Sequence, residues 1–207
     1  MIPARDALAR LKEGNRRFVE HLRDPALDLG GSRRFDPAMN QQPFAIVLGC
    51  SDSRVPAELV FGQGFGDLFV IRVAGNIVAP SQVGSVEFAA TAFHTRLVVV
   101  MGHTGCGAIA ATLEELRRPA PSQSPGLRSI VDRVRPAVEA LMTSSPDMSP
   151  GDLAERAVRA NISASADHLR HGSEVLQRLS ADGLLIVGAE YSLETGVVDF
   201  FDGVPPH

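Results

Sequence analysis

The chain has only two cysteines, and a histidine lies close to one of them in the sequence. Cys50 and His103 each follow a glycine at the end of an apolar run, and Cys106 lies three residues beyond His103. Two thiolates and one imidazole are typical zinc ligands, and three protein ligands leave the fourth tetrahedral position open, as in catalytic rather than structural zinc sites. The sequence therefore predicts one Zn²⁺ per chain with an open position.

A carboxylate and a guanidinium follow the first cysteine in the stretch Cys50-Ser51-Asp52-Ser53-Arg54. In an extended turn, residues 52 and 54 point to the same side. Asp52 can accept a hydrogen bond from water at the metal, or it can become the fourth ligand itself. Arg54 favours the first role, because arginine binds a carboxylate through two parallel hydrogen bonds and would hold Asp52 off the metal.

The two cysteines also allow simpler interpretations than a zinc site. Buried cysteines often serve only as small hydrophobic residues. A disulfide between Cys50 and Cys106 is a second alternative, but it leaves His103, Asp52 and Arg54 without a role. A thioredoxin-like redox site is disfavoured, because the chain has no Cys-x-x-Cys motif.

Composition narrows the class of protein. The 207 residues include 24 acidic and 20 basic side chains, for a net charge of −4, which argues against nucleic acid as the main partner. No stretch approaches the roughly 20 consecutive apolar residues that span a bilayer, and the first residues are charged throughout. We expect a cytoplasmic protein that has no membrane partner.

The pattern of apolar runs and helical periodicities predicts an α/β fold. The expected fold is a mostly parallel β-sheet of four parallel strands plus an edge strand, flanked by helices, with an N-terminal helical arm. We interpret residues 1–207 as one domain. The expected strands are residues 44–48, 68–73, 97–101, 184–187 and 197–201. The expected helices are residues 2–22, 85–94, 108–116, 127–141 and 151–181, and the expected irregular connections are residues 24–42, 118–126 and 143–151.

These elements would bring the chemistry together. Ligands of parallel α/β sheets bind at the carboxyl ends of the strands, where the strand order reverses. The strands that end before Cys50 and His103 could flank that point. Cys106 would lie at the N-terminus of the next helix, which lowers the pKa of a thiol and favours the metal-binding thiolate.

Two motifs carry a resemblance to a known family. Residues 50–54 (CSDSR) together with residues 102–107 (GHTGCG) resemble the β-class carbonic anhydrase family, and the similarity is close from about residue 40 to 110. It extends through residues 66–72, 74–76 and 84–89, and more loosely through 188–191 and 195–196. The resemblance implies reversible hydration of CO2 to bicarbonate and a proton by zinc-hydroxide attack. Cys50, His103 and Cys106 would be the zinc ligands, and Asp52 and Arg54 the catalytic pair.

The resemblance also implies an assembly and a substrate pocket. The family forms homodimers, which can pair into tetramers, and the arm at residues 1–22 would pack on the partner subunit. The apolar pocket for CO2 and bicarbonate would lie at the dimer interface. Gln41 would donate a hydrogen bond to substrate, Phe69 and Phe88 would wall the pocket, and the backbone N–H of Gly107 would lie near the substrate.

The chain departs from the family pattern at two places. Phe88 stands where many members have a tyrosine. An inhibitory bicarbonate site of some members uses a tryptophan, an arginine and a tyrosine, where this chain has Val47, Arg72 and Tyr191. Because the tryptophan is missing, we expect the open state of the metal site.

Two alternative functions keep the same metal site. The first is hydrolysis of CS2 or COS, which proteins of similar fold perform. The second is a non-catalytic zinc protein in which Asp52 is a permanent fourth ligand. Retention of Arg54 argues against the second, because Arg54 would compete with the metal for Asp52.

Overall fold

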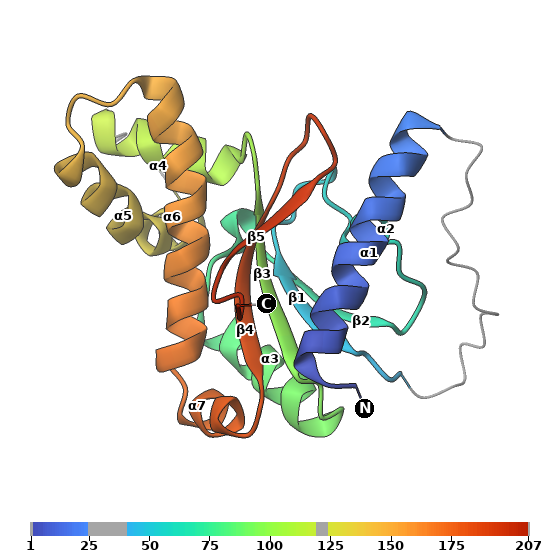
Figure 1. Cartoon of the computed structure of the whole chain (residues 1–207). Coiled ribbons are helices and arrows are strands. Elements are labelled where there is room, and N and C mark those ends of the chain that lie inside the picture. The colour runs from blue at the N-terminus through green and yellow to red at the C-terminus, as the bar shows by residue number, and fades with distance from the viewer. Residues whose placement is uncertain (1, 25–40, 119–123, 207) are drawn as a thin grey trace.

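A five-stranded sheet forms the centre of the molecule (Figure 1). The computed structural model describes residues 2–24, 41–118 and 124–206. The strand order is β2-β1-β3-β4-β5, with β5 antiparallel to β4 and all other neighbours parallel. The strands are β1 (Ala45–Gly49), β2 (Leu68–Arg72), β3 (Leu97–His103), β4 (Leu185–Tyr191) and β5 (Val198–Asp202). The predicted fold, with four parallel strands and an edge strand, is confirmed.

Helices cover both faces of this sheet. One face carries α1 (Ala4–Arg23) and the short α2 (Ala57–Val60), whose apolar residues share a core with Val47 and Val99. The other face carries the remaining helices, which share a core with Leu48 and Val100. These are α3 (Pro80–Ala92), α4 (Gly107–Arg117), α5 (Pro125–Ser144), α6 (Pro150–His171) and α7 (Glu174–Ala181). Side chains of a strand point alternately to the two faces of the sheet. Because helices cover both faces, β1 and β3 are buried at every position.

The long helical region expected at residues 151–181 consists of two helices. Helix α6 ends at His171, and α7 begins after Ser173, whose hydroxyl accepts a hydrogen bond from the N–H of Leu176. Gly172 lies between them, where an added Cβ would lie 2.5 Å from the carbonyl oxygen of His168. The close packing of the chain at this corner therefore requires glycine.

Other helix boundaries differ from the expected ones by a few residues. Helix α3 begins at Pro80, five residues before the expected start at residue 85. Helices α5 and α6 extend into the expected loop at residues 143–151, which leaves a short connection at residues 145–149. Most of the connection expected at residues 24–42, and residues 119–123 of the one expected at 118–126, lie outside the described residues.

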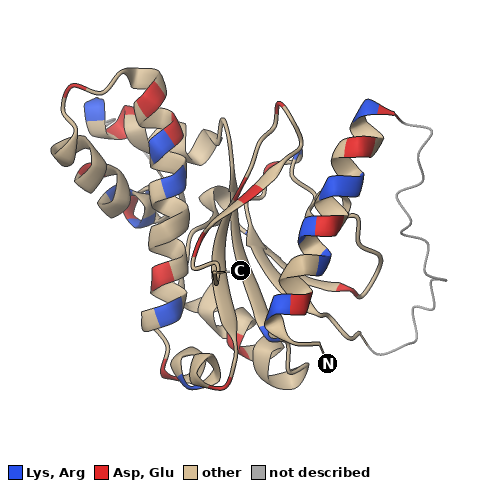
Figure 2. Cartoon of the chain, in the orientation of Figure 1, with Lys and Arg blue, Asp and Glu red and all other residues tan. Residues whose placement is uncertain are grey.

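The expected N-terminal arm is the amphipathic helix α1. Leu8 and Leu11 on its apolar face are buried against the sheet of the same chain. Figure 2 shows that its outer face carries closely spaced acidic and basic residues. Packing of this arm on a partner subunit stays a prediction. None of the helices in the described ranges is long and apolar enough to cross a membrane.

Candidate metal centre

The two strands that lead into the ligands lie side by side in the sheet. Leu48 pairs with Val100 and Gly49 with Met101 in parallel register. From β1 the chain proceeds to β2 on one side and then returns to β3 on the other, so the strand order reverses between β1 and β3. Cys50 follows β1 directly and His103 is the last residue of β3. The predicted position of these two strands on either side of the reversal is therefore confirmed.

The three candidate ligands converge in a buried cluster. The donor atoms of Cys50, His103 and Cys106 all lie within 4.8 Å of one another, and the two sulfurs are 4.0 Å apart. Two sulfurs bound to one tetrahedral zinc at about 2.3 Å would lie roughly 3.8 Å apart, close to the observed separation. The donor set and the separation of the sulfurs therefore fit a zinc ion.

The imidazole of His103 is oriented for ligation. Its Nδ1 lies 2.9 Å from the carbonyl oxygen of Thr104. A carbonyl can only accept, so Nδ1 carries the proton and donates a hydrogen bond to this oxygen. Its Nε2 is buried and has no hydrogen-bond partner among the described residues. A buried nitrogen without a partner is costly unless it binds something, so Nε2 has the tautomer and the environment of a metal ligand.

The two thiols share a hydrogen bond, which shifts their pKa values in opposite directions. The hydrogen bond from Cys106 lowers the pKa of Cys50 well below its usual range, while burial opposes the shift. The same hydrogen bond, together with burial, raises the pKa of Cys106, whereas the N–H groups of Ile109 and Ala108 at the start of α4 lower it. Cys106 is the residue that precedes α4, as expected. A cation between the sulfurs would replace the shared proton.

Two glycines allow the backbone to approach this cluster. Gly75 has φ of 70° and its N–H lies 3.4 Å from the sulfur of Cys50. Gly102 packs so closely on α6 that an added Cβ would lie 2.6 Å from Cδ1 of Ile162. Glycine at position 102 therefore lets β3 carry His103 beneath α6.

Asp52 and Arg54 form the predicted pair beside the ligands. The guanidinium of Arg54 binds both carboxylate oxygens of Asp52, at 2.9 and 2.7 Å, and its backbone N–H adds a third bond at 3.0 Å. These hydrogen bonds hold the pKa of Asp52 well below its usual range, although partial burial opposes them. Oδ2 of Asp52 lies 3.8 Å from Nε2 of His103. An ionised acceptor thus lies next to the cluster and is held there by arginine.

Arg72 supports the loop that carries this pair, a role the sequence analysis missed. Its side chain donates to the carbonyl of Cys50 at 3.1 Å and to the carbonyl of Asp52 at 2.6 Å. Residue 72 is the last residue of β2 and is level with Gly49 at the end of β1. The signal in the sequence was an arginine at the end of the strand next to β1, from which its side chain can donate hydrogen bonds to the loop after β1.

The remaining predicted site residues divide into two groups. Gly107 is the first residue of α4, next to Cys106, whereas Gln41 is exposed just before β1. Phe69 and Phe88 contact each other and Phe93, with ring centroids 5.6 to 6.2 Å apart. Phe69 pairs with Ile46, four residues before Cys50, or about 13 Å along the strand. The aromatic cluster therefore lies toward the other end of the sheet from the chain's own metal centre.

Comparisons with known proteins agree with these features. The family model described as carbonic anhydrase matches residues 45–198. The carbonic anhydrase of Mycolicibacterium smegmatis is 39% identical over 190 residues, which cover 91% of this chain and 89% of that protein. Carbonic anhydrase 2 of Mycobacterium tuberculosis is 37% identical over 190 residues, covering 90% and 87%. The solved β-carbonic anhydrase CafA of Aspergillus fumigatus aligns with a TM-score of 0.71 at 27% identity, covering 97% of this chain and 91% of that chain.

Proposed function

The chain belongs to the β-class carbonic anhydrase family, and we propose that it catalyses the reversible hydration of CO2 to bicarbonate and a proton with one zinc ion per chain. The observation that carries this proposal is the convergence of two sulfurs and one unpartnered imidazole nitrogen beside an ionised Asp52. A nucleophile at neutral pH and an acceptor that orients it are what hydration of an uncharged substrate requires.

Cys50, His103 and Cys106 would hold the zinc ion through Sγ, Nε2 and Sγ. When bound, zinc lowers the pKa of a coordinated water and so makes a nucleophile available near neutral pH. The chain prepares the ligands for this. The carbonyl of Thr104 fixes the tautomer of His103, and the N–H groups at the start of α4 favour the thiolate of Cys106.

Asp52 would accept a hydrogen bond from the attacking water and orient its lone pair toward CO2. The pair with Arg54 keeps this carboxylate ionised over the mildly acidic to alkaline range, so it remains an acceptor. The bidentate bonds to Arg54 also support a role for Asp52 beside the metal rather than as a permanent fourth ligand. Arg72 holds the backbone of the same loop in place.

CO2 has no charge to bind, so its site must be mainly apolar and its binding weak. We propose that the active unit is a homodimer in which Phe69 and Phe88 of one subunit wall the pocket of the other. Phe88 is 55% exposed on α3 and forms a continuous aromatic surface with Phe69 and Phe93. Gln41 and the N–H of Gly107 would supply the polar contacts to substrate.

Removal and return of the metal test this proposal. Protein treated with a thiol-compatible chelator should lose CO2 hydration, and one equivalent of Zn²⁺ per chain should restore it. Circular dichroism before and after treatment would show that the chain stays folded. Full hydration by protein that contains no zinc would refute the proposal.

A further inference from the structure

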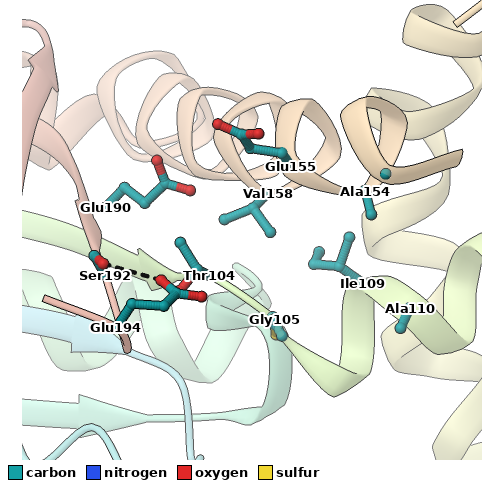
Figure 3. Close-up of a pocket in the computed structure, with 12 residues that line it drawn as sticks. Thr104, Gly105, Ile109, Ala110, Ala154, Glu155, Val158, Glu190, Ser192 and Glu194 are labelled. Atoms are coloured by element: carbon teal, nitrogen blue, oxygen red, sulfur yellow. Dashed lines mark hydrogen bonds between the residues drawn. The ribbon is translucent and has the colours of Figure 1, made fainter. Parts of the chain in front are cut away.

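A hollow lies between the sheet and α6, and Cys106 is one of the residues that line it. Its volume is about 620 Å³, within the range of pockets that bind small molecules. The turn from β3 to α4 forms its floor, and β4 and α6 form its sides (Figure 3). It is lined by Thr104, Gly105, Cys106, Ile109, Ala110, Gly151, Ala154, Glu155, Val158, Glu190, Ser192 and Glu194. Apart from Cys106 and Thr104, the function proposed above makes no use of the residues that line this pocket.

The polar part of the pocket is acidic. Its walls carry Glu155, Glu190 and Glu194, and none of the residues that line it is lysine or arginine. Glu155 projects from α6 and Glu190 from β4, and both lie on the same side of the hollow (Figure 3). Glu194 accepts hydrogen bonds from Ser192 and from Thr104. The pocket therefore presents excess negative charge to whatever enters it.

Glu190 is the residue that points most directly to a ligand. Its side chain is only 10% exposed, and Arg159 binds Oε2 at 3.0 Å while also binding Asp199. The other oxygen, Oε1, is buried and has no hydrogen-bond partner among the described residues. A buried carboxylate oxygen without a donor is costly, and a rotation of the Glu190 side chain that turns Oε1 into the hollow would let a cationic donor in the pocket satisfy it.

The arrangement favours an organic cation over a metal ion. Within the described ranges, the one set of three His, Cys, Asp or Glu side chains whose donor atoms converge is the cluster of Cys50, His103 and Cys106, and the glutamates of the pocket form no such set. Apolar side chains separate them instead, among them Ile109, Ala154 and Val158. A spread of carboxylates around an apolar wall matches a ligand with a charged end and a short hydrocarbon body.

We propose that this pocket binds a small protonated primary amine, whose ammonium group donates to Oε1 of Glu190 and lies near the carboxylate of Glu155, with its alkyl chain against Ile109 and Val158. An ammonium group has three donors and no acceptor, which suits a pocket whose charged groups are all acceptors. The proposal goes beyond CO2 hydration and does not depend on it.

Titration of the zinc-loaded protein with n-butylammonium chloride tests the proposal, with n-butanol as the uncharged match. Amide chemical shifts would be followed by NMR at Gly105, Gly151 and Ser192. We expect saturable shifts at these amides with n-butylammonium, and binding of n-butanol at least about 10-fold weaker. No shifts at these amides, or equal binding of the two probes, would overturn the proposal.

Two variants of pocket residues test whether n-butylammonium binds in this pocket. Glu190→Gln keeps the shape of the side chain and removes its charge, and Arg159 retains Asp199 as a partner. Glu155→Gln lies on the exposed side of α6 and should not disturb folding. Each should weaken n-butylammonium binding by about 10-fold, whereas Glu139→Gln, a half-exposed residue of α5 outside the pocket, should not change it. Unchanged binding in both pocket variants, as expected if the amine simply coordinated zinc, would overturn the proposal.

Discussion

At the scale of single residues, the metal centre depends as much on neighbouring groups as on the ligands. The carbonyl of Thr104 fixes the ring of His103, and Arg54 holds Asp52 beside it. The cluster of Cys50, His103 and Cys106 and the pair of Asp52 and Arg54 could be predicted from the sequence, because Cys, His, Asp and Arg have few common reasons to occur together at glycine-flanked strand ends. The position of Arg72 at a strand end was a signal, but its contacts with two backbone carbonyls and the contact of Gly75 with a sulfur could not be predicted, because they depend on the loop conformation.

The substitution Asp52→Asn tests whether Asp52 orients the nucleophile without being needed for metal binding. The variant keeps the shape of the side chain but loses its charge and its bidentate pairing with Arg54. We expect CO2 hydration to fall by about 100-fold while the zinc content stays at one per chain. Stopped-flow hydration and metal analysis on the same sample would check this, and an unchanged turnover would exclude the role given to Asp52.

Cys106→Ser should remove metal and activity together. A serine hydroxyl does not ionise near neutral pH, so the site would lose one of its two negative ligands. We expect less than one tenth of the zinc content of the unchanged protein after dialysis against a weak chelator, measured by elemental analysis, and a matching loss of hydration. Full zinc content in this variant would show that Cys106 is not a ligand.

At the scale of helices and strands, the sheet was the most predictable part. Runs such as residues 97–101 are rich in β-branched residues and too short for buried helices. The boundary between α6 and α7 was missed, because the helical periodicity continues through residue 172 and the break depends on a close contact with His168. The short α2 and the 3-10 helix η1 (Ala74–Asn76) are also too short to leave a periodic signal.

Gly102→Ala tests the close packing of β3 against α6. The new methyl would lie 2.6 Å from Ile162, so the helix or the strand must shift. We expect the free energy of unfolding in urea to fall by about 1–3 kcal/mol. Gly126→Ala is the matched control, since its Cβ meets nothing within 4 Å and should leave stability unchanged or slightly raised. Equal stabilities of the two variants would contradict the packing described here.

At the scale of the whole molecule, the chain leaves an aromatic surface uncovered. Phe88 is 55% exposed and Phe65 is 77% exposed, and Phe88 continues into the cluster with Phe69 and Phe93. Exposed apolar patches of this kind commonly mark protein–protein interfaces. Sequence alone could indicate the proposed dimer only through the family resemblance, because exposure of an aromatic residue is a property of the folded chain.

Phe88→Asp should weaken the dimer, because it would bury a charge in the proposed interface. We expect the dissociation constant of the dimer to rise by about 100-fold or more in analytical ultracentrifugation. Hydration should fall with dissociation while zinc remains bound. Leu127→Asp replaces another exposed apolar residue, on α5, and should change neither property. A Phe88→Asp variant that remains dimeric and fully active would rule out this interface.

The most direct test of the account is stopped-flow CO2 hydration from mildly acidic to alkaline pH on protein whose zinc content is measured in the same sample. Two thiolate ligands would reduce the effective charge of the proposed zinc ion, so the pKa of a coordinated water should be higher than the value of about 7 known for carbonic anhydrase with three histidine ligands. Asp52 is ionised throughout this range, because its pKa is lowered, and so should not shape the profile. The account predicts zinc-dependent hydration that rises on the alkaline side of neutrality. One zinc per chain with no hydration at any pH would contradict it.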